Sequence, residues 1–234
     1  LEISSWAIFY TSDNFFSDKF ISSFLNTIYL GFLAAIFCTF FSLGLNFLKR
    51  FDKSILLSST SFSLSLGYAV PGLVLAIGII QFFSFLDNEI FKSFFNITLV
   101  GSVFGLLLAY VIKSYALANS AIESGFQRID SSIDDVSRTL KKSKLGIMFR
   151  IHMPLLKTSI FTSILLVISE VIKELPATLI LRPFNFDTLA VSTYLYAAEE
   201  RMYEAAAPAM MIVLIGLVPI IFLSKIIRDS RPGK

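Results

Sequence analysis

Three charged residues lie close together inside an otherwise apolar stretch of this sequence. Glu170 and Glu174 are four residues apart, so a helix would place both carboxylates on one face, with Lys173 beside them. Charges inside a membrane span are costly and usually face the bundle interior or water. The carboxylates could line a path and offer hard oxygens to a passing cation. Alternatively, the cluster neutralises itself and braces the bundle or its outer interface. Pro176 belongs to the same candidate path.

The sequence offers little for other kinds of chemistry. With one His (His152) and one Cys (Cys38), it supports neither a disulfide nor a Cys/His metal site or catalytic pair. It contains no Gly-x-x-x-x-Gly-Lys-Ser/Thr motif, so any ATP would be hydrolysed by another chain. We expect no catalytic residue, no bound cofactor and no fixed metal, with Glu170 and Glu174 as transient ligands at most. We expect His152 at the surface and Cys38 as a small packing residue.

The elements that must position the charged cluster are membrane-spanning helices. Hydrophobic residues make up 55% of the 234 residues, the mean hydropathy is +0.75, and the apolar residues gather in runs of about 20, the length that crosses a bilayer. The sequence predicts an all-α, polytopic transmembrane bundle that forms a single domain over residues 1–234. Pro71 and Gly72 should kink the second span. The five expected spans cover residues 24–48, 61–86, 97–118, 159–180 and 207–223.

The basic residues indicate how the spans are oriented. Most of the Lys and Arg residues fall after the first span, in the segment 128–157 and in the C-terminal tail. The positive-inside rule places these three regions, including the C-terminus, in the cytoplasm. Leu1 would then lie outside, so we expect at least one further span before it and a longer native chain. Lys113, in the third span, is expected to snorkel towards the cytoplasmic face.

The segment 128–157 is the longest polar stretch. Asp134 and Asp135 would lie near the start of a helix and complement its dipole. Four apolar residues could form a patch that enters a partner's groove. They are Leu140, Leu145, Met148 and Phe149. Alternatively, the segment is a solvated loop that fixes topology through its charge.

This segment resembles the EAA loop of inner-membrane permeases of binding-protein-dependent ABC importers. Asp135-Val136-Ser137 falls on the Glu-Ala-Ala of that pattern, and Ile151-His152-Met153-Pro154 falls on its end. Lys141 replaces the expected Gly, so either the tight bend changes or a helix continues there. The resemblance implies a helix that couples to an ATPase. The candidate coupling residues are Asp135, Val136, Ser137, Arg138, Lys141, Leu145 and Pro154.

Further segments resemble ferric-iron permeases, which are often two fused halves. They are residues 173–190 (KELPATLILRPFNFDTLA), 196–201, 204–209 and 67–72 (GYAVPG). The resemblance implies the second half of such a permease in a bacterial inner membrane. Its partners would be the other permease half, a periplasmic or lipid-anchored binding protein that delivers Fe³⁺, and a cytoplasmic ATPase dimer that binds ATP and Mg²⁺. Nucleic acid is not an expected partner. Arg182 and Asp187 are candidate contacts for the binding protein, or form a local ion pair.

Other functions compete with this interpretation. An ion-driven secondary transporter could use Glu170, Lys173 and Glu174 as a relay, although it would not need a basic loop at the EAA spacing. An importer of the same class could carry thiamine or another small solute. A membrane-embedded enzyme has no supporting constellation of residues.

Overall fold

The computed structural model describes residues 2–9, 17–52, 54–91, 98–139 and 143–229, which form helices joined by turns and contain no strand. Among these described residues, five helical stretches are long and apolar enough to cross a membrane, in agreement with the expected number. They cover Asp18–Phe51, Gly72–Glu89, Val103–Gln127, Lys144–Ile172 and Met202–Lys225. The polytopic helical bundle predicted from composition is confirmed.

Three long helices form the centre of the bundle. They are α2 (Asp18–Phe51), α6 (Val103–Gln127) and α9 (Met153–Ile172), and each contacts the other two. The buried face of α2 carries small residues such as Gly31, Ala34 and Cys38, which let neighbouring backbones approach closely. Its other face exposes large apolar side chains such as Phe32 and Phe40, as a lipid-facing surface requires.

Hydroxyl and amide side chains link these helices across their interfaces. Thr39 and Ser163 share a hydrogen bond of 2.8 Å between α2 and α9. The Asn46 amide donates to Oδ1 of Asn119 at 2.8 Å between α2 and α6. Polar groups inside a membrane bundle need such partners, so these bonds fix how the three helices face one another.

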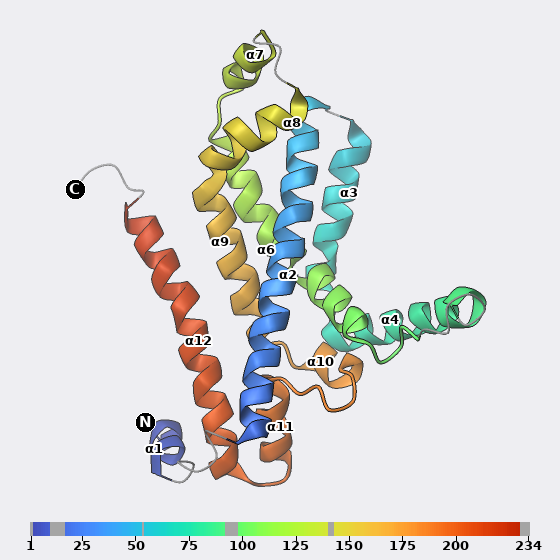
Figure 1. Cartoon of the computed structure of the whole chain (residues 1–234), viewed down its shortest axis with the longest axis vertical. Helices are drawn as coiled ribbons and strands as arrows, with labels where there is room; N and C mark the ends of the chain where they lie inside the picture. The colour runs from blue at the N-terminus through green and yellow to red at the C-terminus, as the bar shows by residue number, and fades with distance from the viewer. Residues whose placement is uncertain (1, 10–16, 53, 92–97, 140–142, 230–234) are drawn as a thin grey trace.

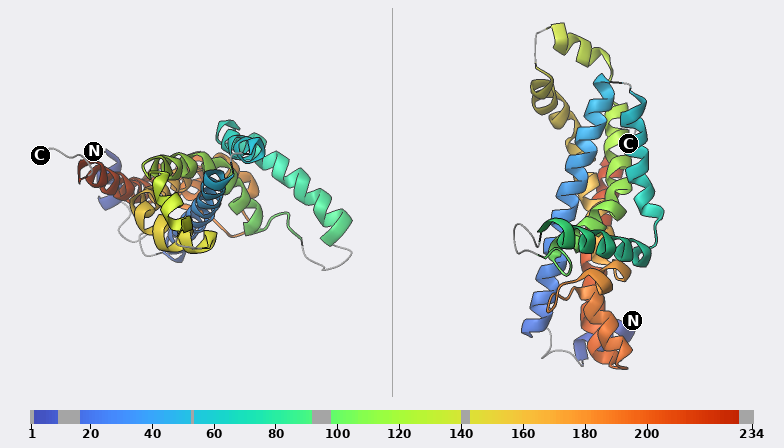
Figure 2. Two further views of the ribbon diagram at one scale, coloured as in Figure 1. Left: turned by 90° about the horizontal axis from the view of Figure 1, so that it is seen from above. Right: turned by 90° about the vertical axis from the view of Figure 1, so that its right-hand side faces the viewer.

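The second expected span is not one kinked helix. Helix α3 (Ile55–Ser65) runs beside α2, a short 3-10 turn η1 (Leu66–Ala69) follows, and α4 (Gly72–Leu86) leaves the bundle at a steep angle (Figures 1 and 2). The expected continuous span over 61–86 was wrong. Val70 precedes Pro71 and is therefore extended rather than helical, with ψ at 127°, so the chain turns instead of bending. A π-helical turn, η2 (Asp87–Phe91), continues α4.

The fourth expected span is also broken. Helix α9 ends at Ile172, and α10 (Pro176–Leu181) begins after a short turn. Pro176 starts α10 because a proline fits the first turn of a helix but cannot continue one. The expected helix over 159–180 is therefore two helices, and Glu170 and Glu174 do not share a helical face.

The remaining helices lie at the two ends and on one side. Helices α1 (Glu2–Phe9) and α11 (Leu189–Ala198) lie at one end beside the start of α12 (Met202–Asp229), with Trp6 packing edge-on against Tyr203 (Figure 1). Helix α7 (Ser132–Thr139) lies at the opposite end. After it, α8 (Lys144–Ile147) and the π-turn η3 (Met148–His152) run directly into α9. The polar loop is thus shorter than the expected 128–157, and Pro154 lies in the first turn of α9.

Candidate coupling site and membrane-embedded ion pair

Helix α7 stands beyond the end of the three-helix centre (Figure 1). The chain leaves α6 at Gln127 and turns at Asp130, whose carboxylate accepts a hydrogen bond of 2.8 Å from the backbone N–H of Ser132. That hydrogen bond lowers the pKa of Asp130 below its ordinary value, with a smaller contribution from the nearby charge of Arg50. This Asx turn satisfies the first backbone N–H of α7, which lacks an intrahelical acceptor, and so stabilises the start of the helix.

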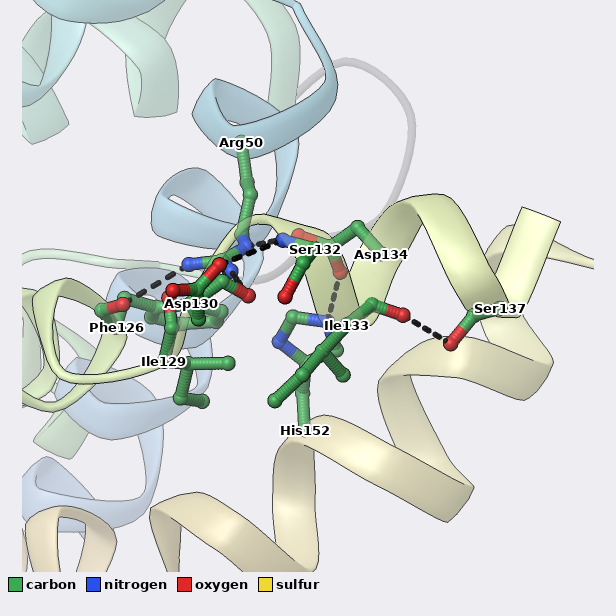
Figure 3. Close-up of polar contacts among 9 residues, drawn as sticks. All are labelled: Arg50, Phe126, Ile129, Asp130, Ser132, Ile133, Asp134, Ser137 and His152. Carbon is green, nitrogen blue, oxygen red and sulfur yellow. Dashed lines mark hydrogen bonds and ion pairs between the residues drawn. The ribbon is translucent and has the colours of Figure 1, made fainter.

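Arg50 reaches this turn from the last turn of α2. Its Nε donates to Oδ2 of Asp134 on α7. Its Nη1 donates to the carbonyl of Phe126 at 2.9 Å, and Nη2 donates to the carbonyls of Ile129 and Asp130 at 2.7 and 2.8 Å (Figure 3). Carbonyls at the end of a helix lack intrahelical donors. The Arg50 guanidinium therefore satisfies carbonyls at the end of α6 and also binds the Asp134 carboxylate on α7.

The second oxygen of Asp134 faces His152. Nε2 of His152 lies 2.7 Å from Oδ1 of Asp134, and because a carboxylate only accepts, Nε2 is the donor (Figure 3). His152 is completely buried, with the rings of Phe47 and Phe126 at centroid distances of 5.7 and 5.4 Å. The expectation of a surface histidine was wrong, because η3 continues into α9 and turns this side chain inward.

The candidate coupling residues differ in exposure. Asp135 and Pro154 are exposed, whereas Ser137 is buried and its hydroxyl donates to the carbonyl of Ile133 at 2.6 Å. Lys141 lies outside the described residues, as does Leu140 of the expected patch, and for Arg138 only the backbone within α7 is described.

The expected apolar patch is only partly exposed. Leu145 and Phe149 are 68% and 63% exposed, and Val136 on α7 is 59% exposed. Met148 instead packs against a buried cluster that includes Leu43 and Leu156. We call the three exposed residues, Val136, Leu145 and Phe149, the docking surface.

The contacts of Arg50 and His152 could not be predicted from the sequence. A basic residue after the first span, such as Arg50, indicates topology, and Asp134 suits the start of a helix. The three residues lie in separate segments, and no local spacing connects them. The available signals were a lone histidine two residues before a proline and an arginine at the end of an apolar run.

A second polar site lies within the bundle, at the break between α9 and α10. Nζ of Lys113 on α6 contacts Oε2 of Glu174, and the other oxygen of Glu174 accepts from the backbone N–H of Ala177 at 3.3 Å. Lys113 is about 21 Å along α6 from its α7 end, at 1.5 Å per residue. Because its ammonium group pairs with Glu174 inside the bundle, Lys113 does not snorkel, contrary to the expectation.

The hydroxyl groups of α6 and α10 add a second link at this break. The hydroxyls of Tyr110 and Thr178 lie 2.7 Å apart, and Thr178 also donates to the carbonyl of Glu174 at 2.7 Å. Tyr110 is one turn before Lys113 on the same face of α6. Two side chains of one helix therefore hold the turn that follows α9.

The GYAVPG turn packs against the same region through its two glycines. A Cβ on Gly72 would lie 2.7 Å from Oε1 of Glu174, and one on Gly67 would lie 2.5 Å from the carbonyl oxygen of Ile112. At Gly67 the nearest atom belongs to the backbone, so a side chain there would force α6 or η1 to move, whereas at Gly72 it is the end of the Glu174 side chain. The two helix breaks, at 66–71 and 173–175, thus meet beside the Lys113–Glu174 ion pair.

The other charged candidates form local pairs. Glu170 pairs with the exposed Lys173 at 3.0 Å, separately from Glu174. Arg182 pairs with Asp187, whose carbonyl also accepts from the Asn26 amide at 2.9 Å, so the expected local ion pair is confirmed. Among the described residues, no group of three or more His, Cys, Asp or Glu side chains could hold a metal ion.

Two transport permeases align with most of this chain. The chain is 26% identical over 208 residues to the Fe(3+)-transport system permease protein FbpB 2 of Haemophilus influenzae. This alignment covers 88% of the chain and 39% of that protein. It is 30% identical over 162 residues to the molybdate/tungstate transport system permease protein WtpB of Methanocaldococcus jannaschii, covering 69% of the chain and 64% of the relative. The chain therefore spans less than two thirds of the length of either relative.

A solved structure shares the fold. A chain of a bacterial alginate ABC transporter, solved in complex with an alginate-bound periplasmic protein, superposes with a TM-score of 0.77 at 14% identity. The match covers 97% of this chain and 85% of that chain. The family model for the inner membrane component of binding-protein-dependent transport systems matches residues 28–230. With nearly its whole length matched, the chain belongs to this family of multi-pass inner-membrane transport components.

Proposed function

We propose that this chain is the membrane-spanning permease portion of an ATP-driven importer, and that a separate cytoplasmic ATPase dimer docks on α7 and the turns that follow it. The observation that carries the proposal is the docking surface. Val136, Leu145 and Phe149 expose apolar side chains at the end of the bundle where the resemblance to the EAA loop lies. An apolar face on a protruding helix suits a hydrophobic groove on a partner. ATP and Mg²⁺ would bind to that partner.

The proposed cargo is ferric iron, delivered by a periplasmic or lipid-anchored binding protein. This rests on the Fe(3+)-transport relative and on the segment 173–190, which resembles ferric-iron permeases. The molybdate/tungstate relative makes an oxyanion the alternative cargo. A second permease half would complete the pore. Arg182 and Asp187 would contact the binding protein at the outer end, and the C-terminus would be cytoplasmic.

The proposed translocation path passes the two helix breaks. Discontinuous helices at membrane depth are typical of substrate sites in transporters, because their free backbone groups are tolerated only where they line a cavity or are buried in protein. Glu174 and Pro176 lie at one such break, opposite Gly72. Both oxygens of Glu174 have partners, so a cation could use this carboxylate only after Lys113 moves away. Glu170 and Lys173, which pair together, would lie beside this path.

The test is uptake into proteoliposomes that contain the full-length permease, its ATPase and its binding protein. We expect uptake of labelled Fe³⁺ that requires ATP inside the vesicles and the binding protein outside. Uptake of molybdate instead would keep the importer and replace the cargo. Uptake driven by an ion gradient without ATP would contradict the proposal and favour a secondary transporter.

A further inference from the structure

We propose that Arg50 and His152 are positioning residues that grip Asp134 from two sides and make α7 move as one body with α2, α6 and α9. We call Arg50, Asp134 and His152 the clamp. This inference rests on the proposed docking of an ATPase at α7. It adds how a push on α7 reaches the membrane helices.

Helix α7 is too short to be stable by itself. It has eight residues, and isolated helices shorter than about 12 residues are marginal in water. Among the described side chains of α7, Asp134 and Ser137 are the buried polar ones, and the hydroxyl of Ser137 bonds within α7 itself. Asp134 instead contacts Arg50 on α2 and His152 in η3, so it ties α7 to other helices.

Arg50 makes the first set of contacts in the clamp. A guanidinium presents several donors in a rigid planar fork, and here the donors reach Asp134 and three carbonyls between Phe126 and Asp130. The end of α2, the end of α6 and α7 are thereby joined at one side chain. A lysine would keep the charge but not this set of directions.

His152 makes the second contact in the clamp, from the π-turn that leads into α9. Its Nδ1 is buried and has no hydrogen-bond partner among the described residues. A buried polar atom without a partner destabilises a fold, and an apolar side chain among Phe47 and Phe126 would avoid that cost. The use of histidine here is explained by Nε2, which donates to Asp134.

The clamp and the docking surface are separate sets of residues. Val136, Leu145 and Phe149 expose their side chains, whereas Asp134 and His152 are buried. A push on α7 is carried through Asp134 to the three helices that form the bundle's centre, and packed elements of this kind respond as bodies rather than deforming locally. Weakening the clamp should leave the ATPase bound but lower the amount of cargo transported per ATP hydrolysed.

The test measures cargo transported per ATP hydrolysed by the reconstituted full-length transporter. We expect His152→Leu and Arg50→Lys to keep the ATPase in the purified complex and to lower this ratio by about tenfold, a typical size for coupling between sites. His152→Gln should restore most of the ratio, because its amide N–H can donate to Asp134 in place of Nε2. Lys49→Gln removes a charge next to Arg50 and serves as the control, with an unchanged ratio.

The outcomes separate this inference from the proposed function. If the unmodified transporter binds no ATPase, the docking proposal fails. If it binds and transports, and His152→Leu has the same ratio as the unmodified protein, the clamp is overturned. Equal losses in His152→Leu and His152→Gln would also overturn it, because a donor to Asp134 would not matter. If one variant fails to assemble, the same comparison is made with Arg50→Lys against Lys49→Gln.

Discussion

The carboxylate of Glu174 and the ammonium group of Lys113 form an ion pair that joins α6 to the break between α9 and α10, although 61 residues separate them in sequence. Both side chains are largely buried, with 18% of Lys113 and 7% of Glu174 exposed. The pair therefore fixes the turn after α9 against α6.

Removing one partner of this pair should be worse than removing both. Glu174→Gln leaves a largely buried ammonium without its counter-ion and should lower the free energy of unfolding by about 3 kcal/mol. Lys113→Met combined with Glu174→Leu removes both charges and should recover most of that loss. Unfolding in detergent measures the free energy for the unmodified protein, for Glu174→Gln and for the double variant. An equal loss in the single and double variants would show that the two charges do not interact.

The close approach at Gly67 gives a prediction with a matched control. Gly67→Ala places a methyl group 2.5 Å from the carbonyl oxygen of Ile112 and should destabilise the fold by about 1–3 kcal/mol. Gly78→Ala, on α4, meets no atom within 4 Å and should stabilise its helix by up to about 1 kcal/mol. Thermal unfolding of both variants checks this. A tolerated Gly67→Ala would mean that η1 shifts freely against α6.

The docking surface can be tested without measuring transport. Val136→Asp combined with Leu145→Asp puts two charges where an apolar contact is expected, and should reduce ATPase retention on the purified complex by at least about tenfold. Ile55→Asp is the control, since Ile55 is an 85% exposed apolar residue at the start of α3 and outside this surface. Equal retention by all these variants would place the ATPase elsewhere.

The stability of the Asp130 turn before α7 depends on pH in a defined direction. Because the hydrogen bond from Ser132 lowers the pKa of Asp130, the folded state favours the carboxylate. Its contribution is complete above the ordinary pKa of the carboxyl and is lost as pH falls through the lowered value. ATPase retention should thus show no titration from Asp130 near neutral pH. Asp130→Ala should raise amide exchange in α7 at neutral pH, whereas Asp130→Asn, whose side-chain oxygen can accept the same hydrogen bond, should not.

The sequence could predict the bundle because apolar runs of membrane length are a strong and local signal. The expected spans overlap α2, α6, α9 and α12, and Arg182 and Asp187 pair across only five positions. The length of an apolar run does not reveal whether its backbone is continuous. Pro71 was therefore expected to kink a helix that in fact turns at Val70, and the break before Pro176 was not expected.

The contacts that define the two polar sites could not be predicted for a different reason. Arg50 and Asp134 are 84 positions apart, and each alone has an ordinary explanation as a topology charge or a helix-dipole partner. Lys113 was likewise explained by snorkelling. Such pairs are brought together by the packing of α2, α6 and α9, and one sequence contains no record of that packing.

The most direct test of the account places a photo-crosslinking amino acid at position 145 or position 184 of the full-length chain in intact cells. Leu145 is exposed beside α7, and Phe184 is 95% exposed on the loop closed by Arg182 and Asp187, away from α7. If the ATPase docks at α7 and the turns after it, position 145 captures a nucleotide-binding ATPase, identified by mass spectrometry, and position 184 does not. Capture of the ATPase from position 184, or no ATPase from position 145 in actively transporting cells, would contradict it.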